Sequence, residues 1–289
     1  MTGNRKGVPL HPNGKNSRGA VLIMALLIVA AVSSLAVSFA AAFQISLARG
    51  ENRWHGAQAD AYLAGAESFA IGILEQDAAD SEIDTLDEQW AQEPPPFTFD
   101  EGWMTAELED AQGRFNLNAL AGEVKSSASQ SDPGKRFSAP QRRFIRLLQT
   151  FEEPRLGESE AIALVEALVD WIDADEEVTG FGGAESSYYG QQETPYQAAN
   201  APFASVTELR LVRDVTPTLY RALLPLVVAL PGSFGMNINT MPLQLLRSLQ
   251  VPKALEPLSQ DEAQRLLDAR GTAGYEKLED FASNEVWRD

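Results

Sequence analysis

Arg18-Gly19-Ala20-Val21-Leu22-Ile23-Met24-Ala25-Leu26-Leu27-Ile28-Val29-Ala30-Ala31-Val32 opens an uncharged run that continues to Ala48. A helix rises about 1.5 Å per residue and the hydrocarbon core of a bilayer is roughly 30 Å thick, so about 20 apolar residues span it. The segment 20–43 is long enough to do so. The run therefore predicts a transmembrane helix, and the rest of the chain is organised around it.

Two interpretations of this run compete. The first is a secretory signal peptide that is removed after small residues, for example at Ser38-Phe39-Ala40 or Ala40-Ala41-Ala42. The second is a membrane helix that is retained. The apolar part of a signal peptide usually has about 7–15 residues, and this run is longer. Its length favours retention.

The residues before the run form a short basic leader, 1–19. Its charged residues are all positive: Arg5, Lys6, Lys15 and Arg18. Positive charge next to an apolar helix favours the cytoplasmic side, so we expect the N-terminus in the cytoplasm and the bulk of the chain across the membrane. Residues 1–17 lack periodicity and are expected to be disordered.

Composition excludes several kinds of site. The chain of 289 residues has a formal net charge of −18, which repels nucleic-acid phosphate, so we expect no nucleic-acid partner. It has no cysteine, which excludes disulfides, thiol catalysis and thiolate zinc sites. The two histidines, His11 and His55, lie in the leader and near the membrane helix. Any site in the exported part must use carboxylates, hydroxyls and amides.

Helical spacing extends beyond the membrane run, and a sheet is expected after it. Small and apolar residues recur three or four positions apart from Trp54 to Ile71, which predicts one rod to about Leu74. The segments 104–109 and 114–118 alternate around the turn residues 110–113, which is typical of a β-hairpin.

The segment from Pro140 onward changes to helical patterns. Apolar stripes and caps predict helices near 144–151 and 162–172, helices that begin at Ser205 and at Thr216, a helix at 242–249, and a last helix from Ser259 to Gly271. A short strand is expected at 236–240. The sequence thus predicts a helical block between two pieces of sheet, an α+β arrangement.

The densest acidic segment runs from Asp170 to Gly180, with Glu185 beyond it. Alternate carboxylates in a loop can converge on Ca²⁺, which accepts six to eight oxygens in flexible geometry. We expect Asp173, Asp175, Glu177 and Glu185 to be side-chain ligands, with the Val178 carbonyl as a further candidate. The alternative is a solvated acidic helix end, although acids there oppose the helix dipole.

Other chemistry has weaker support. Ser186-Ser187 has no histidine partner for a triad, and no carboxylate pair is singled out for acid–base catalysis. The segment 237–270 is similar to helix-hairpin-helix modules, but its connection at 250–255 lacks the glycine that presents backbone N–H groups to phosphate. We interpret it as a structural helix pair, and we expect no enzymatic activity.

Several short segments, in their order, resemble the family of type II secretion minor pseudopilin K, also called general secretory pathway protein K. These segments are Gln112-Gly113-Arg114-Phe115-Asn116-Leu117-Asn118, Asp170-Trp171-Ile172-Asp173, Ser187-Tyr188-Tyr189, Pro195-Tyr196, Asn200-Ala201-Pro202, Glu208-Leu209 and Asn237-Ile238-Asn239-Thr240. The resemblance begins at Gly19 and covers nearly the whole chain.

The resemblance implies cleavage by prepilin peptidase between Gly19 and Ala20, followed by N-terminal methylation. Most pilin-like subunits carry Glu at the fifth mature position, whereas this chain has Met24, as the K family does. A membrane carboxylate costs about 2.5–3.5 kcal/mol and normally needs a partner. In pilin assembly that partner is the terminal amine of the subunit ahead, so a subunit without the Glu suits a filament tip.

The family's fold is a long N-terminal helix packed on a small antiparallel sheet, with a large all-α domain that is inserted in the sheet and binds two Ca²⁺ ions. Transferred to this sequence, the expected parts are a leader (1–19), a transmembrane helix (20–43), the rest of the helix with the first sheet part (44–120), the inserted domain (121–235) and the C-terminal sheet part (236–289). The family's fold would have closing strands after Phe281, but the given sequence stops at Asp289, so we expect either a short sheet or a truncated sequence.

The resulting expectation is a minor pseudopilin in the inner membrane, with its folded domain in the periplasm. It would join minor pseudopilins I and J at the pseudopilus tip, start pseudopilus assembly and promote protein export. Further implied partners are the major pseudopilin and the inner-membrane assembly platform. The alternative is an exported acidic calcium-dependent binding module or hydrolase, released by signal-peptide cleavage.

Overall fold

The computed structural model describes residues 17–99, 102–125, 133–232, 234–249 and 255–287. The disorder predicted for the leader therefore concerns residues that lie outside this description, apart from position 17. The chain divides into two compact units, Met1–Phe69 and Ala70–Asp289, and each is described by itself.

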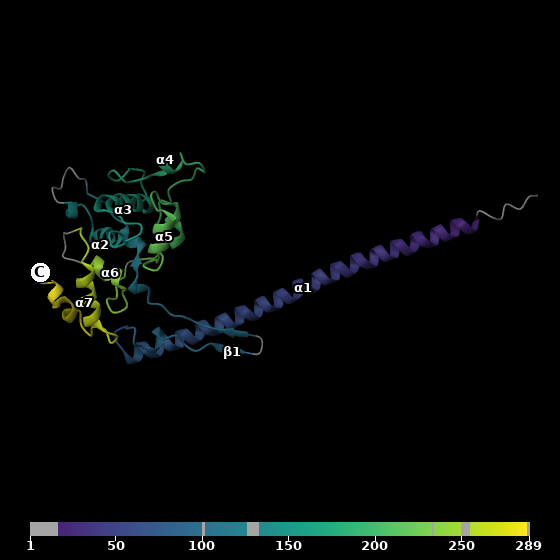
Figure 1. Cartoon of the computed structure of the whole chain (residues 1–289), viewed down its shortest axis with the longest axis horizontal. Coiled ribbons are helices and arrows are strands. Elements are labelled where there is room, and N and C mark those ends of the chain that lie inside the picture. Colours follow the sequence, from purple (N-terminus) through teal and green to yellow (C-terminus); the bar gives the residue numbers. More distant parts are fainter. Residues whose placement is uncertain (1–16, 100–101, 126–132, 233, 250–254, 288–289) are drawn as a thin grey trace, which may run out of the picture. The chain divides into compact units, whose positions relative to one another are not determined.

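A single helix, α1 (Ser17–Asp80), begins in the first unit and ends in the second. It contains 64 residues and is drawn as one continuous coil in Figure 1. Its apolar part has a mean hydropathy of 2.8 and none of it is buried within the protein. Among the described residues it is the one helix long and apolar enough to cross a membrane. The predicted rod is confirmed, and it runs six residues beyond Leu74.

Two pairs of short strands lie in the second unit. β1 (Phe97–Phe99) and β2 (Gly102–Met104) are antiparallel, with Phe97 opposite Met104. β3 (Phe115–Asn116) and β4 (Val227–Val228) are parallel, with Phe115 opposite Val227.

The hairpin predicted between 104–109 and 114–118 is wrong. Gly113 ends the short 3₁₀ helix η2 (Ala111–Gly113), which Asp110 caps by accepting from the Gln112 backbone N–H. The Phe115 N–H donates to Leu226 O at 2.8 Å instead of pairing with 104–109. The alternating pattern was correct for a strand, but its partner lies more than a hundred residues away.

The strand expected at 236–240 is also wrong. Asn237 accepts from the Asn239 N–H through its side chain, and Asn239 in turn accepts from the Tyr275 N–H. These side chains satisfy turn backbone that a strand would have paired with a neighbour. The segment is a turn that joins distant parts of the chain.

The helical patterns are confirmed, since each predicted helix has an α or 3₁₀ helix at its place. Ser138, Ser205 and Ser259 each form a capping box with the third residue after the cap, and Thr216 caps with proline following. The longer helices are α2 (Ala139–Leu148), α3 (Glu158–Ile172), α5 (Pro217–Leu223), α6 (Leu243–Ser248) and α7 (Gln260–Arg270). The shorter elements are η1 (Gln89–Ala91), η3 (Leu117–Leu120), η5 (Pro133–Lys135), α4 (Ser186–Tyr189), η6 (Val206–Leu211), α8 (Leu278–Ala282) and η7 (Glu285–Trp287).

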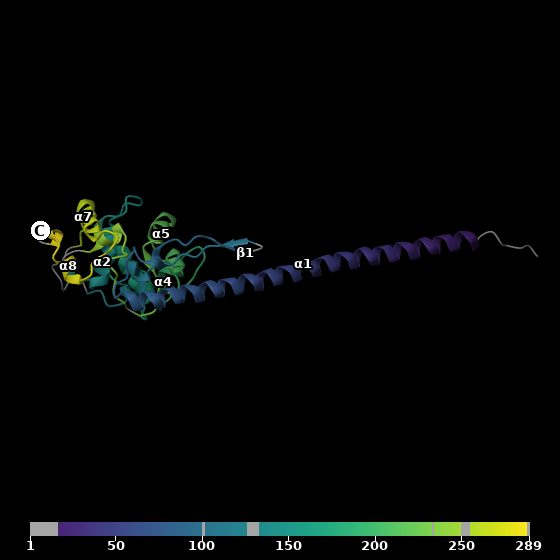
Figure 2. The ribbon, with the colours of Figure 1, turned by 90° about the horizontal axis from the view of Figure 1, so that it is seen from below.

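These helices share one hydrophobic core. α2 packs against α3 on one side and against α6 on the other, and α6 packs against α7 (Figure 1). Figure 2 shows α8 beside the C-terminal end of the described chain. Fully buried side chains come from every layer, including Phe115, Phe144, Leu168, Leu219, Leu245 and Leu266. The segment between β3 and β4 contains α2 to α5, so a strand pair brackets much of the helical block; the exact domain boundaries stay a prediction.

Candidate metal centre

The acidic segment forms a loop between α3 and α4. Asp173 is the residue that ends α3, and Glu185 is the residue that precedes α4. Carboxylate oxygens of Asp173, Asp175 and Glu185 all lie within 4.8 Å of one another. Three of the four predicted side-chain ligands are therefore brought together from positions twelve residues apart.

Several oxygens of this group have no hydrogen-bond partner among the described residues. Glu185 is only 1% exposed, and both its carboxylate oxygens are buried and unpaired. Asp173 Oδ1 is also buried and unpaired. A buried polar atom without a partner costs about 1–3 kcal/mol, and more if it is charged. Asp173, Asp175 and Glu185 form no ion pair with a basic side chain within the described part of the chain.

Burial and mutual repulsion change the protonation of these acids. Burial, followed by the charges of Asp170 and Asp173, raises the pKa of Glu185 to about 8. Burial and the neighbouring Asp175 raise the pKa of Asp173 to about 6. Without a cation, the carboxyl group of Glu185 therefore keeps its proton at neutral pH, where it would be ionised in water.

The loop is fastened to α3 by two further acids. Glu166 Oε2 accepts from the N–H groups of Phe181 and Gly182, at 3.1 and 2.8 Å. Its other oxygen forms a buried ion pair with Arg136 at 2.8 Å. Asp170, which is fully buried, accepts from the Thr179 N–H at 3.1 Å. These contacts hold the loop against α3, although the loop itself contains no helix or strand.

Glycine is required where the loop meets α3. A Cβ on Gly183 would lie 2.4 Å from Asp170 Oδ2 and from the Thr179 carbonyl. Gly180 has φ of +59° and a Cβ there would collide with the Glu166 carboxylate. The close approach places the acidic loop over the C-terminal part of α3.

Glu177 lies outside the group of three. Its side chain is exposed, and its backbone N–H donates to Asp175 Oδ1 at 2.8 Å, which fixes the turn. Its role as a ligand stays a prediction, as does that of the Val178 carbonyl. Sequence reasoning missed Asn200, whose side chain donates to Asp175 O and to Glu176 Oε1 while its Oδ1 is buried and unpaired. No periodic pattern in the sequence identifies Asn200 as part of the site. Its one sequence signal is its place in the family segment Asn200-Ala201-Pro202.

The arrangement suits a hard cation. All the candidate groups are oxygen donors, the ligands Ca²⁺ prefers, and they come from a loop and from the residues that flank two helices. The unpaired oxygens of Asp173 and Glu185 are what a cation would neutralise. The three residues therefore fit a calcium ion by their chemistry.

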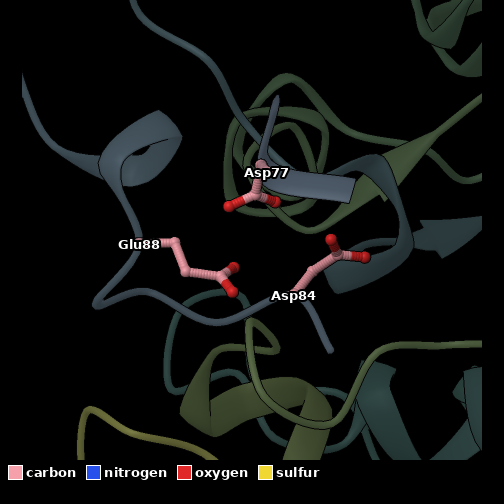
Figure 3. A group of neighbouring side chains, drawn as sticks. All are labelled: Asp77, Asp84 and Glu88. Carbon is pink, nitrogen blue, oxygen red and sulfur yellow. The ribbon is translucent and has the colours of Figure 1, made fainter. Parts of the chain in front are cut away.

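A second acidic group is present in the same unit. Asp77, near the end of α1, lies close to Asp84 and Glu88 from the loop that follows, and carboxylate oxygens of the three residues lie within 4.8 Å of one another (Figure 3). Here, however, Glu88 Oε2 accepts from the Thr85 N–H at 2.7 Å and from Trp90 Nε1 at 2.9 Å. These protein donors already satisfy that carboxylate.

Comparison with known proteins gives a consistent result. Two family models described as "Type II secretion system (T2SS), protein K" match residues 113–232 and 236–289. The chain belongs to this family. A type II secretion system protein K of Pseudomonas aeruginosa is 34% identical over 277 residues, covering 93% of this chain and 77% of the relative. One from Aeromonas hydrophila is 33% identical, covering 92% and 80%.

A solved structure of the family is similar as well. It is the crystal structure of the GspK-GspI-GspJ complex from the type 2 secretion system of enterotoxigenic Escherichia coli, with a TM-score of 0.69 and 30% identity over 83% of this chain and 79% of that one. The α+β fold expected from the sequence, with a long helix, a small antiparallel sheet and a largely helical domain, is thereby confirmed.

The predicted N-terminal positions all lie in α1. Gly19, Ala20 and Met24 are exposed along the apolar part of the helix, and Met24 is 67% exposed. Cleavage at Gly19 and the tip role of Met24 stay predictions.

Proposed function

We propose that this chain is a non-enzymatic minor pseudopilin that forms the pseudopilus tip together with minor pseudopilins I and J. Membership of the protein K family supports this, and a family member has been solved in a complex named GspK-GspI-GspJ. By starting pseudopilus assembly, the subunit promotes export of proteins across the outer membrane. The major pseudopilin and the inner-membrane assembly platform are its further partners.

The apolar part of α1 anchors the subunit in the inner membrane. Its exposed apolar side chains suit lipid or the helices of neighbouring subunits. The basic leader holds the N-terminus in the cytoplasm and places the folded domain in the periplasm. Prepilin peptidase removes residues 1–19, and the new terminus at Ala20 is methylated.

The residue at position 24 supports the tip position. Met24 places no carboxylate in the apolar helix, so the subunit needs no terminal amine from a subunit ahead of it. A subunit with this property can occupy the first place in the filament.

Asp173, Asp175 and Glu185 hold a structural Ca²⁺ ion in the helical block. The unpaired buried oxygens of Asp173 and Glu185 carry this part of the proposal. When bound, the ion supplies the positive charge that these carboxylates lack, and it joins the end of α3 to the start of α4. Ca²⁺ is structural here and takes part in no reaction.

The experiment combines the full chain with pseudopilins I and J of the same organism in a strain that lacks the native protein K. The wild type should restore secretion, co-purify with both partners and show a methylated N-terminal Ala20 by mass spectrometry. Met24→Glu should reduce secretion and Met24→Leu should not. A mature terminus near Ala41 would favour a released exported protein, and full secretion with Met24→Glu would refute the tip position.

A further inference from the structure

A pocket of about 720 Å³ is lined in part by α2 and by no residue of α3 or of the metal centre. It is lined by arginines of α2, by the segment that follows β4, and by α8 and η7. Its cationic residues are Arg142, Arg143 and Arg146. Three arginines on one pocket wall are unexpected in a chain of net charge −18.

Arg142 and Arg143 form no ion pair with a carboxylate among the described residues. Arg143 Nη1 donates to the sulfur of Met236 at 2.8 Å, and a thioether is a weak acceptor. Arg142 donates to the carbonyls of Gly134 and Phe137, while its Nε is buried and unpaired. The acids of the neighbouring α8, Glu279 and Asp280, form no ion pair with either arginine within the described chain.

Burial makes this positive charge costly. Arg146 is 4% exposed and donates to Ser248 O, and burial with the charges of Arg142 and Arg143 lowers its pKa to about 10. Burial also lowers the pKa of Arg143. An anion in the pocket would offset repulsion and desolvation at the same time.

The remaining lining is apolar and rigid. Trp287 donates its Nε1 to Phe281 O at 2.8 Å, and the two rings lie 5.3 Å apart, centroid to centroid. Met236 and Met241 add adaptable surface. Trp, Phe, Met and Arg are the residue types enriched at the centres of protein–protein interfaces. A planar guanidinium favours paired contact with a carboxylate.

We propose that this pocket binds an acidic segment of a protein partner, in which a carboxylate that pairs with Arg143 stands beside an aromatic or aliphatic side chain that contacts Phe281 and Trp287. The site is separate from the metal centre and does not depend on the ion. It also does not depend on the pseudopilin role.

The probe is a blocked synthetic peptide, Ser-Glu-Phe-Glu-Leu-Ser, titrated by calorimetry and tryptophan fluorescence into the full chain in detergent. Binding should be weakened at least tenfold when both Glu are replaced by Gln in the peptide, and when the protein carries Arg143→Gln. The affinity of the Arg143→Lys variant for the peptide should lie between those of the wild type and of Arg143→Gln. The matched control is Arg265→Gln, which removes the same charge from the exposed face of α7 and should change nothing.

A second variant covers the case in which Arg143→Gln does not fold, as checked by circular dichroism. Ala282→Trp fills the pocket from an exposed lining position without removing an arginine, and it should also abolish binding. Equal binding of the Gln peptide, full binding by either variant, or no binding at millimolar peptide would overturn the proposal. So would Arg143-dependent binding of phosphatidylglycerol vesicles without binding of the peptide, since the ligand would then be a lipid.

Discussion

The two acidic groups of this protein differ in how their oxygens are satisfied. In the group of Asp77, Asp84 and Glu88, other protein groups donate hydrogen bonds to a carboxylate. Burial alone would raise the pKa of Glu88, but the hydrogen bonds from Thr85 and Trp90 outweigh it and lower this pKa. Glu185 in the other group has no such donors, and its pKa is raised to about 8. Closeness of carboxylates is common to both groups, so it does not identify a metal site. The unpaired buried oxygens do.

The largest expected difference is the response to calcium. Ca²⁺ at about 100 times its Kd should stabilise the helical block by about 2.7 kcal/mol, a rise of several degrees in the melting temperature. Mg²⁺ should have a smaller effect because it demands tighter octahedral geometry. The measurement is thermal unfolding of the full chain in detergent with EDTA, Ca²⁺ or Mg²⁺. A melting temperature that does not change with Ca²⁺ would show that neither group binds the ion.

A matched pair of substitutions assigns the ion to one group. Glu185→Gln should remove most of the calcium-induced shift, since it replaces a candidate ligand. Glu88→Gln should keep the whole shift and instead lower stability without calcium by about 1–2 kcal/mol, because charge-assisted hydrogen bonds are lost. Each variant is melted with EDTA and with Ca²⁺. The reverse pattern would move the metal site to the loop after α1.

The pH dependence of stability should have opposite signs at Glu185 and at Glu88. The pKa of Glu185 is raised from 4.5 to about 8, so between these values the folded chain binds more protons than the unfolded chain. Its free energy of unfolding without calcium should therefore fall as pH rises from about 4.5 to 8. Glu88, whose pKa is lowered, contributes stability that is lost as pH falls below 4.5.

Urea unfolding in EDTA across this range measures the slope. Glu185→Gln should flatten the slope between pH 4.5 and 8, and Glu88→Gln should leave it unchanged. An unchanged slope in Glu185→Gln would mean that Glu185 ionises as it does in water.

The smallest effect is expected at Glu177. Its exposed side chain lies outside the group, and the turn contact uses its backbone N–H, which Glu177→Gln preserves. The variant should retain the calcium shift within about 0.5 kcal/mol, as surface substitutions generally do. Isothermal titration of Ca²⁺ checks this. A large loss of affinity would add Glu177 to the ligands and confirm the full set expected from the sequence.

Short sequence patterns predicted the structural features that depend only on residues close together in the sequence. The apolar run predicted the apolar part of α1, and serine caps with a partner three residues later predicted the start of η6 and α7. The two errors involve asparagine-rich segments. Asn116 binds Leu230 and Gly232, and Asn118 binds Phe203, all far away in sequence. In the sequence, the alternation of such residues looks the same as the alternation in a hairpin strand. Only the distant hydrogen-bond partners distinguish the two cases.

The metal centre shows the same limit. Asp173, Asp175 and Glu185 were predicted because carboxylates in a loop can converge. The burial of Glu185 and the nearness of Asn200 depend on how the loop folds back onto α3, which Glu166 and Arg136 control from other elements. Sequence spacing alone therefore placed Glu177 in the ligand set although its side chain points to solvent.

The parallel pairing of β3 with β4 has an evolutionary consequence. Because Phe115 lies opposite Val227, the chain leaves the scaffold and returns to it at neighbouring points. The intervening residues 117–226 therefore begin and end at neighbouring points. Lengthening such a loop costs only about 0.6 kcal/mol for each doubling of its length. A block of helices can thus be gained, exchanged or trimmed there while the frame that carries it keeps its geometry. A member of this family can acquire new surface by this route while the paired strands stay unchanged.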